Sequence, residues 1–144
     1  MVRYFFFIPF AATFLPHAAL AQSTLCPLSL STKGTSIEQP AGWQSYAPPP
    51  VILEKDGTSY HLYSINFVED DDIDFLPPSK TGNTKDSVSY HWQFNKKSDY
   101  EIDCIYDGTS THLTQKLTPG LKSCEAIYKK GKDGKLSFST AQCN

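Results

Sequence analysis

Alternation of apolar and polar residues is the feature that most restricts how this chain can fold. It recurs in residues 58–67 and 87–94, with the two-residue period of a β-strand. No stretch shows the longer period of an extended amphipathic helix. The first strand is expected to place on one face His61, Tyr63, Ile65 and Phe67. The second is expected to place on its core face Val88, Tyr90, Trp92 and Phe94.

Two further stretches predict β-hairpins. Residues 100–117 contain Asp107-Gly108 at their centre, and residues 124–143 contain Asp133-Gly134 near their middle. Asp-Gly pairs favour tight turns between antiparallel strands. We therefore expect a meander of about four strands in the C-terminal half.

The N-terminal half contains weaker strand signals. Residues 33–50 are rich in glycine, proline and polar residues, which predicts a loop with Trp43 as its buried anchor. The predicted fold is mainly β: a single antiparallel sheet or sandwich-like domain with long N-terminal loops and two disulfides. A small α+β domain is the alternative.

The first residues are typical of a secretory signal peptide. Arg3 precedes an apolar run through Leu15, and the small-residue pattern Ala19-Leu20-Ala21 precedes Gln22. We expect residues 1–21 to be removed, leaving residues 22–144 as one domain. Because no second long apolar segment follows, we expect no membrane span.

Four cysteines follow the predicted signal peptide. Extracytoplasmic thiols oxidise, so two disulfides are expected. A zinc site is less favoured, because the nearest two cysteines are 19 residues apart and zinc ligands usually come in close pairs. Three pairings are open, and the predicted second hairpin favours Cys124 with Cys143, which leaves Cys26 with Cys104.

Charge limits the class of partner. Residues 22–144 contain 12 lysines, no arginine and 15 acidic residues, a formal charge of 12 − 15 = −3. Nucleic-acid recognition favours a basic surface and the bidentate arginine side chain. We therefore expect no nucleic-acid partner.

Catalytic motifs are absent from the sequence. It contains neither G-x-S-x-G nor H-E-x-x-H. His61, His91 and His112 are more simply explained as strand or turn side chains than as catalytic groups. We expect a protein that is not an enzyme and needs no cofactor.

An acidic segment at residues 68–79 raises the question of calcium. Asp70, Asp72 and Asp74 have the alternate spacing that begins an EF-hand loop. The required glycine and glutamate are replaced by Phe75 and Thr81, so a specific calcium site is disfavoured. A solvated turn and a partner-binding loop remain as alternatives.

Charge is also unevenly distributed along the chain. Residues 54–74 contain seven acids and one lysine, whereas residues 116–135 contain six lysines and two acids. Such polarity can orient a charged protein partner, although two solvated hairpins would look the same.

Short landmarks in a fixed order carry a family resemblance. They are Cys26-Pro27, Gly42-Trp43, Phe67 with the acidic segment and Leu76-Pro77, Trp92-x-Phe94, the C-x-Y-x-G-T string of residues 104–109, and Cys124-Glu125 with Cys143. This succession resembles a family of small exported proteobacterial proteins with four cysteines. The family includes immunity proteins of type VI secretion effectors that attack peptidoglycan, notably those with an L,D-transpeptidase-like fold.

The resemblance implies a periplasmic immunity protein that binds and neutralises a cognate effector, acting as a monomer. Candidate partner-binding residues are Glu69, Asp70, Asp71, Asp72, Asp74, Phe75, Leu76, Asp107 and Thr109. Phe75 and Leu76 could instead hold the acidic loop against the core. Two alternative functions are an inhibitor of lysozyme-type enzymes, whose basic surface would suit an acidic loop, and an envelope structural or adhesive subunit.

Overall fold

The computed structural model describes residues 25–34, 36–47, 55–69, 74–95 and 97–144. Within these residues the chain forms ten strands and no helix. The strands are β1 (Ser29–Lys33), β2 (Ser36–Ile37), β3 (Gln44–Tyr46), β4 (Ser59–Glu69), β5 (Lys80–Asn83), β6 (Ser87–Gln93), β7 (Tyr100–Tyr106), β8 (His112–Lys116), β9 (Ser123–Lys130) and β10 (Leu136–Cys143).

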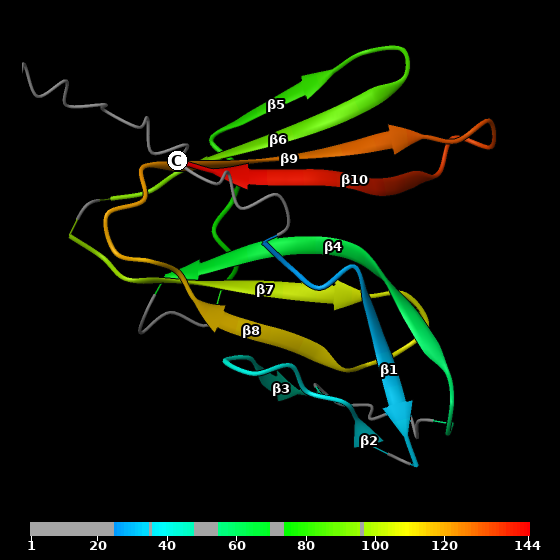
Figure 1. Ribbon diagram of the computed structural model, residues 1–144. Coiled ribbons are helices and arrows are strands. Elements are labelled where there is room, and N and C mark those ends of the chain that lie inside the picture. Colours follow the sequence, from blue (N-terminus) through cyan, green and yellow to red (C-terminus); the bar gives the residue numbers. More distant parts are fainter. Residues whose placement is uncertain (1–24, 35, 48–54, 70–73, 96) are drawn as a thin grey trace, which may run out of the picture.

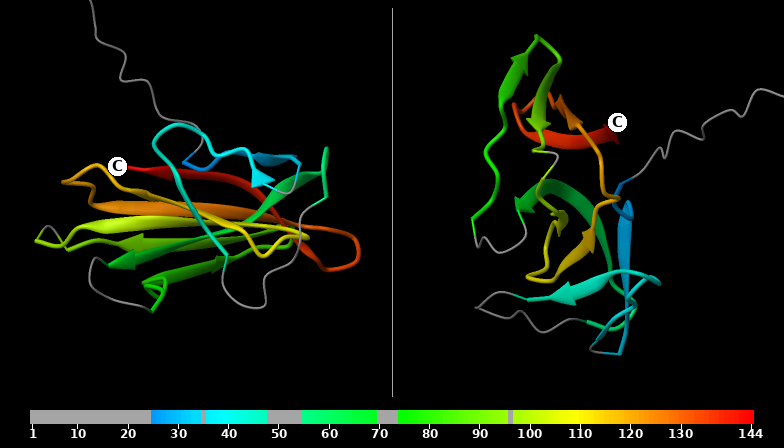
Figure 2. Two further views of the ribbon diagram at one scale, coloured as in Figure 1. Left: turned by 90° about the horizontal axis from the view of Figure 1, so that it is seen from below. Right: turned by 90° about the vertical axis from the view of Figure 1, so that its left-hand side faces the viewer.

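The strands form two antiparallel sheets. One has the order β2-β1-β4-β7-β8-β3 and the other β10-β9-β6-β5. Figure 1 shows the four-stranded sheet above the larger one, and the views in Figure 2 show how strongly the larger sheet curls. The mainly β, antiparallel fold predicted from the sequence is confirmed.

The predicted meander is wrong, although both of its hairpins form. β7 and β8 pair around Gly108, and β9 and β10 pair around Gly134, each glycine having a positive φ. The two hairpins belong to different sheets, because β7 also pairs with β4 whereas β9 also pairs with β6. Local turn signals predicted each hairpin, but the sheet that a hairpin joins depends on contacts distant in the sequence.

The predicted face of β4 is also wrong. The β4–β7 register shifts between Leu62 and Ser64, a β-bulge at Tyr63. A bulge adds one residue and reverses the alternation beyond it. Leu62, Ile65 and Phe67 are therefore buried, whereas His61 and Tyr63 are exposed.

The core lies between the two sheets and is rich in aromatic side chains. Phe67 of β4 makes edge-on contacts with Trp92 of β6 in the opposite sheet and with Phe94 just after β6, at ring-centroid distances of 4.9 and 5.2 Å. Such pairs prefer tilted or edge-on geometry. Trp92 also donates its indole N–H to the carbonyl oxygen of Leu76 at 2.9 Å.

The loop predicted at residues 33–50 contains two short strands instead. β2 pairs with β1, and β3 pairs with β8. β2 folds back on the strand directly before it, whereas β3 forms because β8, distant in the sequence, offers it an edge, which local composition does not reveal. Trp43, predicted as a buried anchor, packs against the core but is only half-buried, and residues 35 and 48–50 lie outside the described residues.

Both predicted disulfides are present. Cys26 bonds to Cys104, and Cys124 bonds to Cys143, which lies directly opposite it in the β9–β10 ladder. The Tyr106 hydroxyl donates a hydrogen bond to the Pro27 carbonyl at 2.9 Å. These contacts fasten the segment before β1 to the centre of the larger sheet. In the described part of the chain, no helix has the length and apolar character needed to cross a bilayer.

Candidate functional site

The acidic segment predicted to bind a partner follows β4. Glu69 ends that strand, Asp70, Asp71 and Asp72 lie outside the described residues, and Asp74 is exposed. The two apolar residues that follow, Phe75 and Leu76, lie in different environments. Leu76 is held to the core, because its N–H donates to the Phe67 carbonyl at 2.7 Å and its carbonyl accepts from Trp92.

Phe75 remains on the surface. Its side chain is 48% exposed, although its backbone bridges to Val68. Of the two apolar residues predicted to contact a partner, only Phe75 therefore presents a large apolar surface to solvent.

The second predicted partner-binding segment lies at the other end of the same strands. Asp107 and Thr109 belong to the turn between β7 and β8, and the Asp107 N–H donates to the His61 carbonyl at 2.9 Å. Thr109 accepts from the Thr111 N–H at 2.9 Å, so its hydroxyl helps to shape the turn. The structure does not bring the two segments together, because they are separated by most of the β4–β7 ladder, about 23 Å at about 3.3 Å per residue.

A groove opens beside this turn, between β4 of the larger sheet and β10 of the smaller one. Its volume is about 750 Å³. In Figure 1 the β7–β8 turn and the tip of the β9–β10 hairpin lie at the same end of the molecule. The lining residues are His61, Leu62, Tyr63, Asp107, Lys135, Leu136, Ser137 and Phe138.

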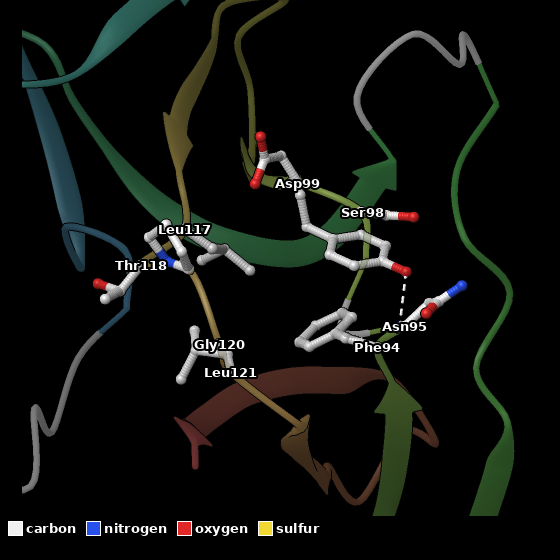
Figure 3. A pocket seen from close by; sticks show the side chains of 10 residues that line it. Phe94, Asn95, Ser98, Asp99, Leu117, Thr118, Gly120 and Leu121 are labelled. Atoms are coloured by element: carbon white, nitrogen blue, oxygen red, sulfur yellow. Dashed lines mark hydrogen bonds between the residues drawn. The ribbon is translucent and has the colours of Figure 1, made fainter.

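A smaller cavity lies at the opposite end, among the connections after β6 and β8. Its volume is about 10 Å³, about the minimum needed to hold one water molecule. Figure 3 shows Phe94 and Leu121 lining it. The Asn95 N–H donates to the hydroxyl of Tyr100 at 2.9 Å. This cavity is too small to receive a side chain from a partner.

A buried ionisable pair lies on the outer face of the larger sheet. Asp103 of β7 is 2% exposed, and its Oδ2 lies 3.0 Å from Nδ1 of His112 in β8. Among the described residues, the other carboxylate oxygen has no hydrogen-bond partner. Burial raises the pKa of Asp103, and His112 opposes this rise through its charge and its hydrogen bond.

Two tyrosines are affected by the charge of the Asp103 carboxylate. Burial and the charge of Asp103 raise the pKa of both Tyr46 and Tyr106. The Tyr46 ring meets His112 edge-on at 5.1 Å between ring centroids. The sequence interpretation missed Asp103, although the predicted hairpin already placed it on the strand next to His112.

The remaining histidines lie apart from one another in the fold. His91 of β6 faces Glu125 of β9 at 3.0 Å in a partly exposed pair, and His61 lines the groove. Within the described ranges, no group of three or more histidine, cysteine or acidic side chains could hold a metal ion.

The match to a family model shows which family this chain belongs to. The model for the type VI secretion system Tli immunity protein matches residues 57–144, more than half of the chain. The chain belongs to the Tli immunity protein family. Neither the curated proteins nor the solved structures contain a match. As a family member, it is a type VI secretion immunity protein, a class that is generally non-enzymatic and binds a cognate effector.

The landmarks that carried the resemblance are structural contacts in this Tli family member. Cys26 forms a disulfide with Cys104, and the Pro27 carbonyl accepts a hydrogen bond from the Tyr106 hydroxyl. The Trp92 indole N–H donates to the carbonyl of Leu76. Cys26 and Pro27, which the family model does not match, are thereby fastened to the matched part. Such landmarks identify the family through its fold, so they do not locate the surface that binds an effector.

Proposed function

We propose that this Tli family member is exported to the periplasm and protects the cell by binding its cognate effector there. The match of residues 57–144 to the immunity family carries the proposal. Two disulfides support the location, because disulfides persist in oxidising compartments and are rare in the cytosol. The apolar leader with its Ala19-Leu20-Ala21 pattern supplies the route.

Binding alone accounts for protection, and the chain needs no catalytic group for it. An effector is neutralised when a partner covers its active site or the surface by which it reaches its substrate. A rigid β fold with preformed surfaces suits this role, because less conformational entropy is lost when a preorganised surface binds. The proposed form is a monomer that engages one effector.

We further propose that the effector attacks peptidoglycan. The support is the resemblance to exported four-cysteine proteins that neutralise effectors with an L,D-transpeptidase-like fold. In that case the effector and this chain would meet in the periplasm, where the cell wall lies.

The test is co-expression with the effector encoded beside this gene, the effector being directed to the periplasm. Cells that carry the full-length chain should survive, whereas cells with the chain lacking residues 1–21 should die, because that form stays in the cytosol. If cells die equally with and without the full-length chain, the immunity proposal is wrong. If both forms protect, the periplasmic location is wrong.

A second readout tests the effector's target. Purified sacculi treated with the effector should release soluble muropeptides or change their cross-links, and the chain should prevent this. If the effector kills while leaving the sacculi unchanged, the peptidoglycan proposal is wrong and immunity through another envelope target remains.

A further inference from the structure

The groove between β4 and β10 combines features that an effector-binding surface needs. Its volume of about 750 Å³ compares with about 150 Å³ for an engineered cavity that holds one benzene ring. It can therefore receive several side chains. Leu136 and Phe138 supply an apolar floor, and Asp107 and Lys135 stand exposed in its lining.

Tyr63 is the most exposed aromatic side chain at the groove. It is 56% exposed although it lies within the long strand β4. The bulge explains this exposure, because Tyr63 is the extra residue between Leu62 and Ser64, and the residues that face the core on either side of the bulge are Leu62 and Ile65. Strand packing therefore presents Tyr63 outward.

Both walls of the groove contain a bulge. In the ladders formed by the described strands, the register shifts at two places: between Leu62 and Ser64 in β4, and between Phe138 and Thr140 in β10. Bulges re-aim side chains and are over-represented beside functional sites. The two bulges, on the strands that face each other across the groove, are therefore an observation in favour of a functional surface that does not depend on the groove volume.

Hydrogen bonds hold the β4 wall in place. The Tyr128 hydroxyl of β9 accepts from the Ile65 N–H at 3.2 Å and lies 3.2 Å from the Ser64 hydroxyl. The Tyr128 ring also meets Phe138 edge-on at 5.7 Å between centroids. One side chain thus links the two bulged strands, so the groove is formed before a partner arrives.

We propose that this groove is where the chain binds its effector. The occupant is a loop of the effector that inserts an apolar or aromatic side chain between Tyr63 and Phe138, with a basic residue beside it facing Asp107. Large apolar anchors ringed by charges are typical of the residues that dominate binding energy. This inference rests on the proposed immunity function and adds the surface and the chemistry of the partner.

The test compares the groove with matched surface aromatics elsewhere. Tyr63→Ser and Asp107→Asn alter the groove, Tyr46→Ser is the control, its side chain being 46% exposed, and Phe75→Ser, at 48% exposed, tests the competing site at the acidic end of β4. The probe is a catalytically inactive form of the effector encoded beside this gene. Tyr63→Ser should weaken binding at least about thirtyfold, the size of a hot-spot effect, and Asp107→Asn several-fold. The Tyr46→Ser control should stay within about twofold, any loss in Phe75→Ser should be smaller than that in Tyr63→Ser, and thermal melting should show that every variant folds.

Each other outcome overturns the assignment. If both groove variants bind like the unaltered chain, the groove is not the site and immunity by another surface stands. If Phe75→Ser alone weakens binding, the acidic end of β4 is the site. If the unaltered chain fails to bind, the proposed function itself fails. If Tyr63→Ser instead abolishes self-association in sedimentation, the occupant is a second copy of the chain.

Discussion

The hydroxyl of Tyr128 accepts a hydrogen bond from the backbone N–H of Ile65, and this contact joins the two sheets at the bulge of β4. Ile65 is 1% exposed, so its N–H has no access to bulk water. A buried donor that loses its partner costs about 1 to 3 kcal/mol. This hydrogen bond therefore helps to hold β4 of the larger sheet against β9 of the smaller one.

Replacing Tyr128 with phenylalanine should lower the free energy of unfolding by about 2 kcal/mol, because it leaves the Ile65 N–H without a partner. Urea denaturation measures the change, and hydrogen exchange should accelerate at Ile65. Tyr90→Phe is the matched control, since the Tyr90 ring meets Tyr128 edge-on at 5.6 Å between centroids and no hydroxyl hydrogen bond is found for it among the described residues. Equal losses in the two variants would contradict this role of the hydroxyl.

The His112 side chain should stabilise the fold by compensating the buried Asp103 carboxylate. His112→Ala is expected to lower the free energy of unfolding by about 3 kcal/mol, as when one partner of a buried pair is removed. His91→Ala is the control, because the His91–Glu125 pair is partly exposed, at 38% and 28%, and should contribute less than about 1 kcal/mol. Similar losses of unfolding free energy in His112→Ala and His91→Ala would show that His112 does not compensate the Asp103 carboxylate.

The pH dependence of stability should identify Asp103 directly. Because burial raises its pKa in the folded state, its contribution to stability is fully present below its ordinary pKa, about 4. This contribution is lost as the pH rises through the raised value. Asp103→Asn has no titrating group at this position and lacks this pH dependence. The free energy of unfolding of the variant, measured relative to that of the unaltered chain, should therefore rise between pH 3 and pH 7. A difference that stays constant or falls over this range would contradict the prediction.

The two disulfides should contribute unequally. They close segments with sequence separations of 78 and 19 residues, for which loop-closure entropy predicts about 4.5 and about 3.2 kcal/mol. Replacing Cys26 and Cys104 with alanine should therefore cost more than replacing Cys124 and Cys143. Denaturation of the two double variants measures the difference, and a larger loss from the Cys124/Cys143 variant would contradict the ordering.

Export should leave a defined chain. When the full-length protein is produced with a signal peptidase present, its intact mass should correspond to residues 22–144, because the small residues Ala19 and Ala21 favour cleavage before Gln22. The mass should be lower by four hydrogens than that of the reduced chain. An Ala19→Asp, Ala21→Asp double variant should remain uncleaved. A full-length, reduced protein in the unaltered strain would contradict the proposed export.

Local sequence patterns predicted much of the fold. The long strands around residues 59–69 and 87–93, the glycine turns at residues 108 and 134 and the disulfide pairing all arise from alternation, turn chemistry or hairpin geometry. The division into two sheets was not predicted from these patterns, because it depends on which distant strand pairs with β7 or β9. The bulge at Tyr63 was missed for a similar reason, since the Ile65 N–H beside it donates to the hydroxyl of Tyr128, 63 residues away.

The candidate site was predictable only in part. The turn at Asp107 was selected from the sequence and does line the groove, but Tyr63 was predicted to share a face with Ile65 and Phe67 and was not selected as a binding residue, and Phe138 was not selected either. Neither residue carries a local signal, because both become neighbours of the groove only when the two sheets meet. The contribution of the acidic segment at residues 69–76 to binding stays a prediction.

The most direct measurement of the central claim uses the purified chain, residues 22–144 with both disulfides formed, and the purified effector encoded beside its gene. The effector's activity is followed while the chain is added. The account predicts that activity falls to zero at about one chain per effector and that the two proteins elute together in gel filtration. Full effector activity in the presence of excess oxidised chain would contradict the account.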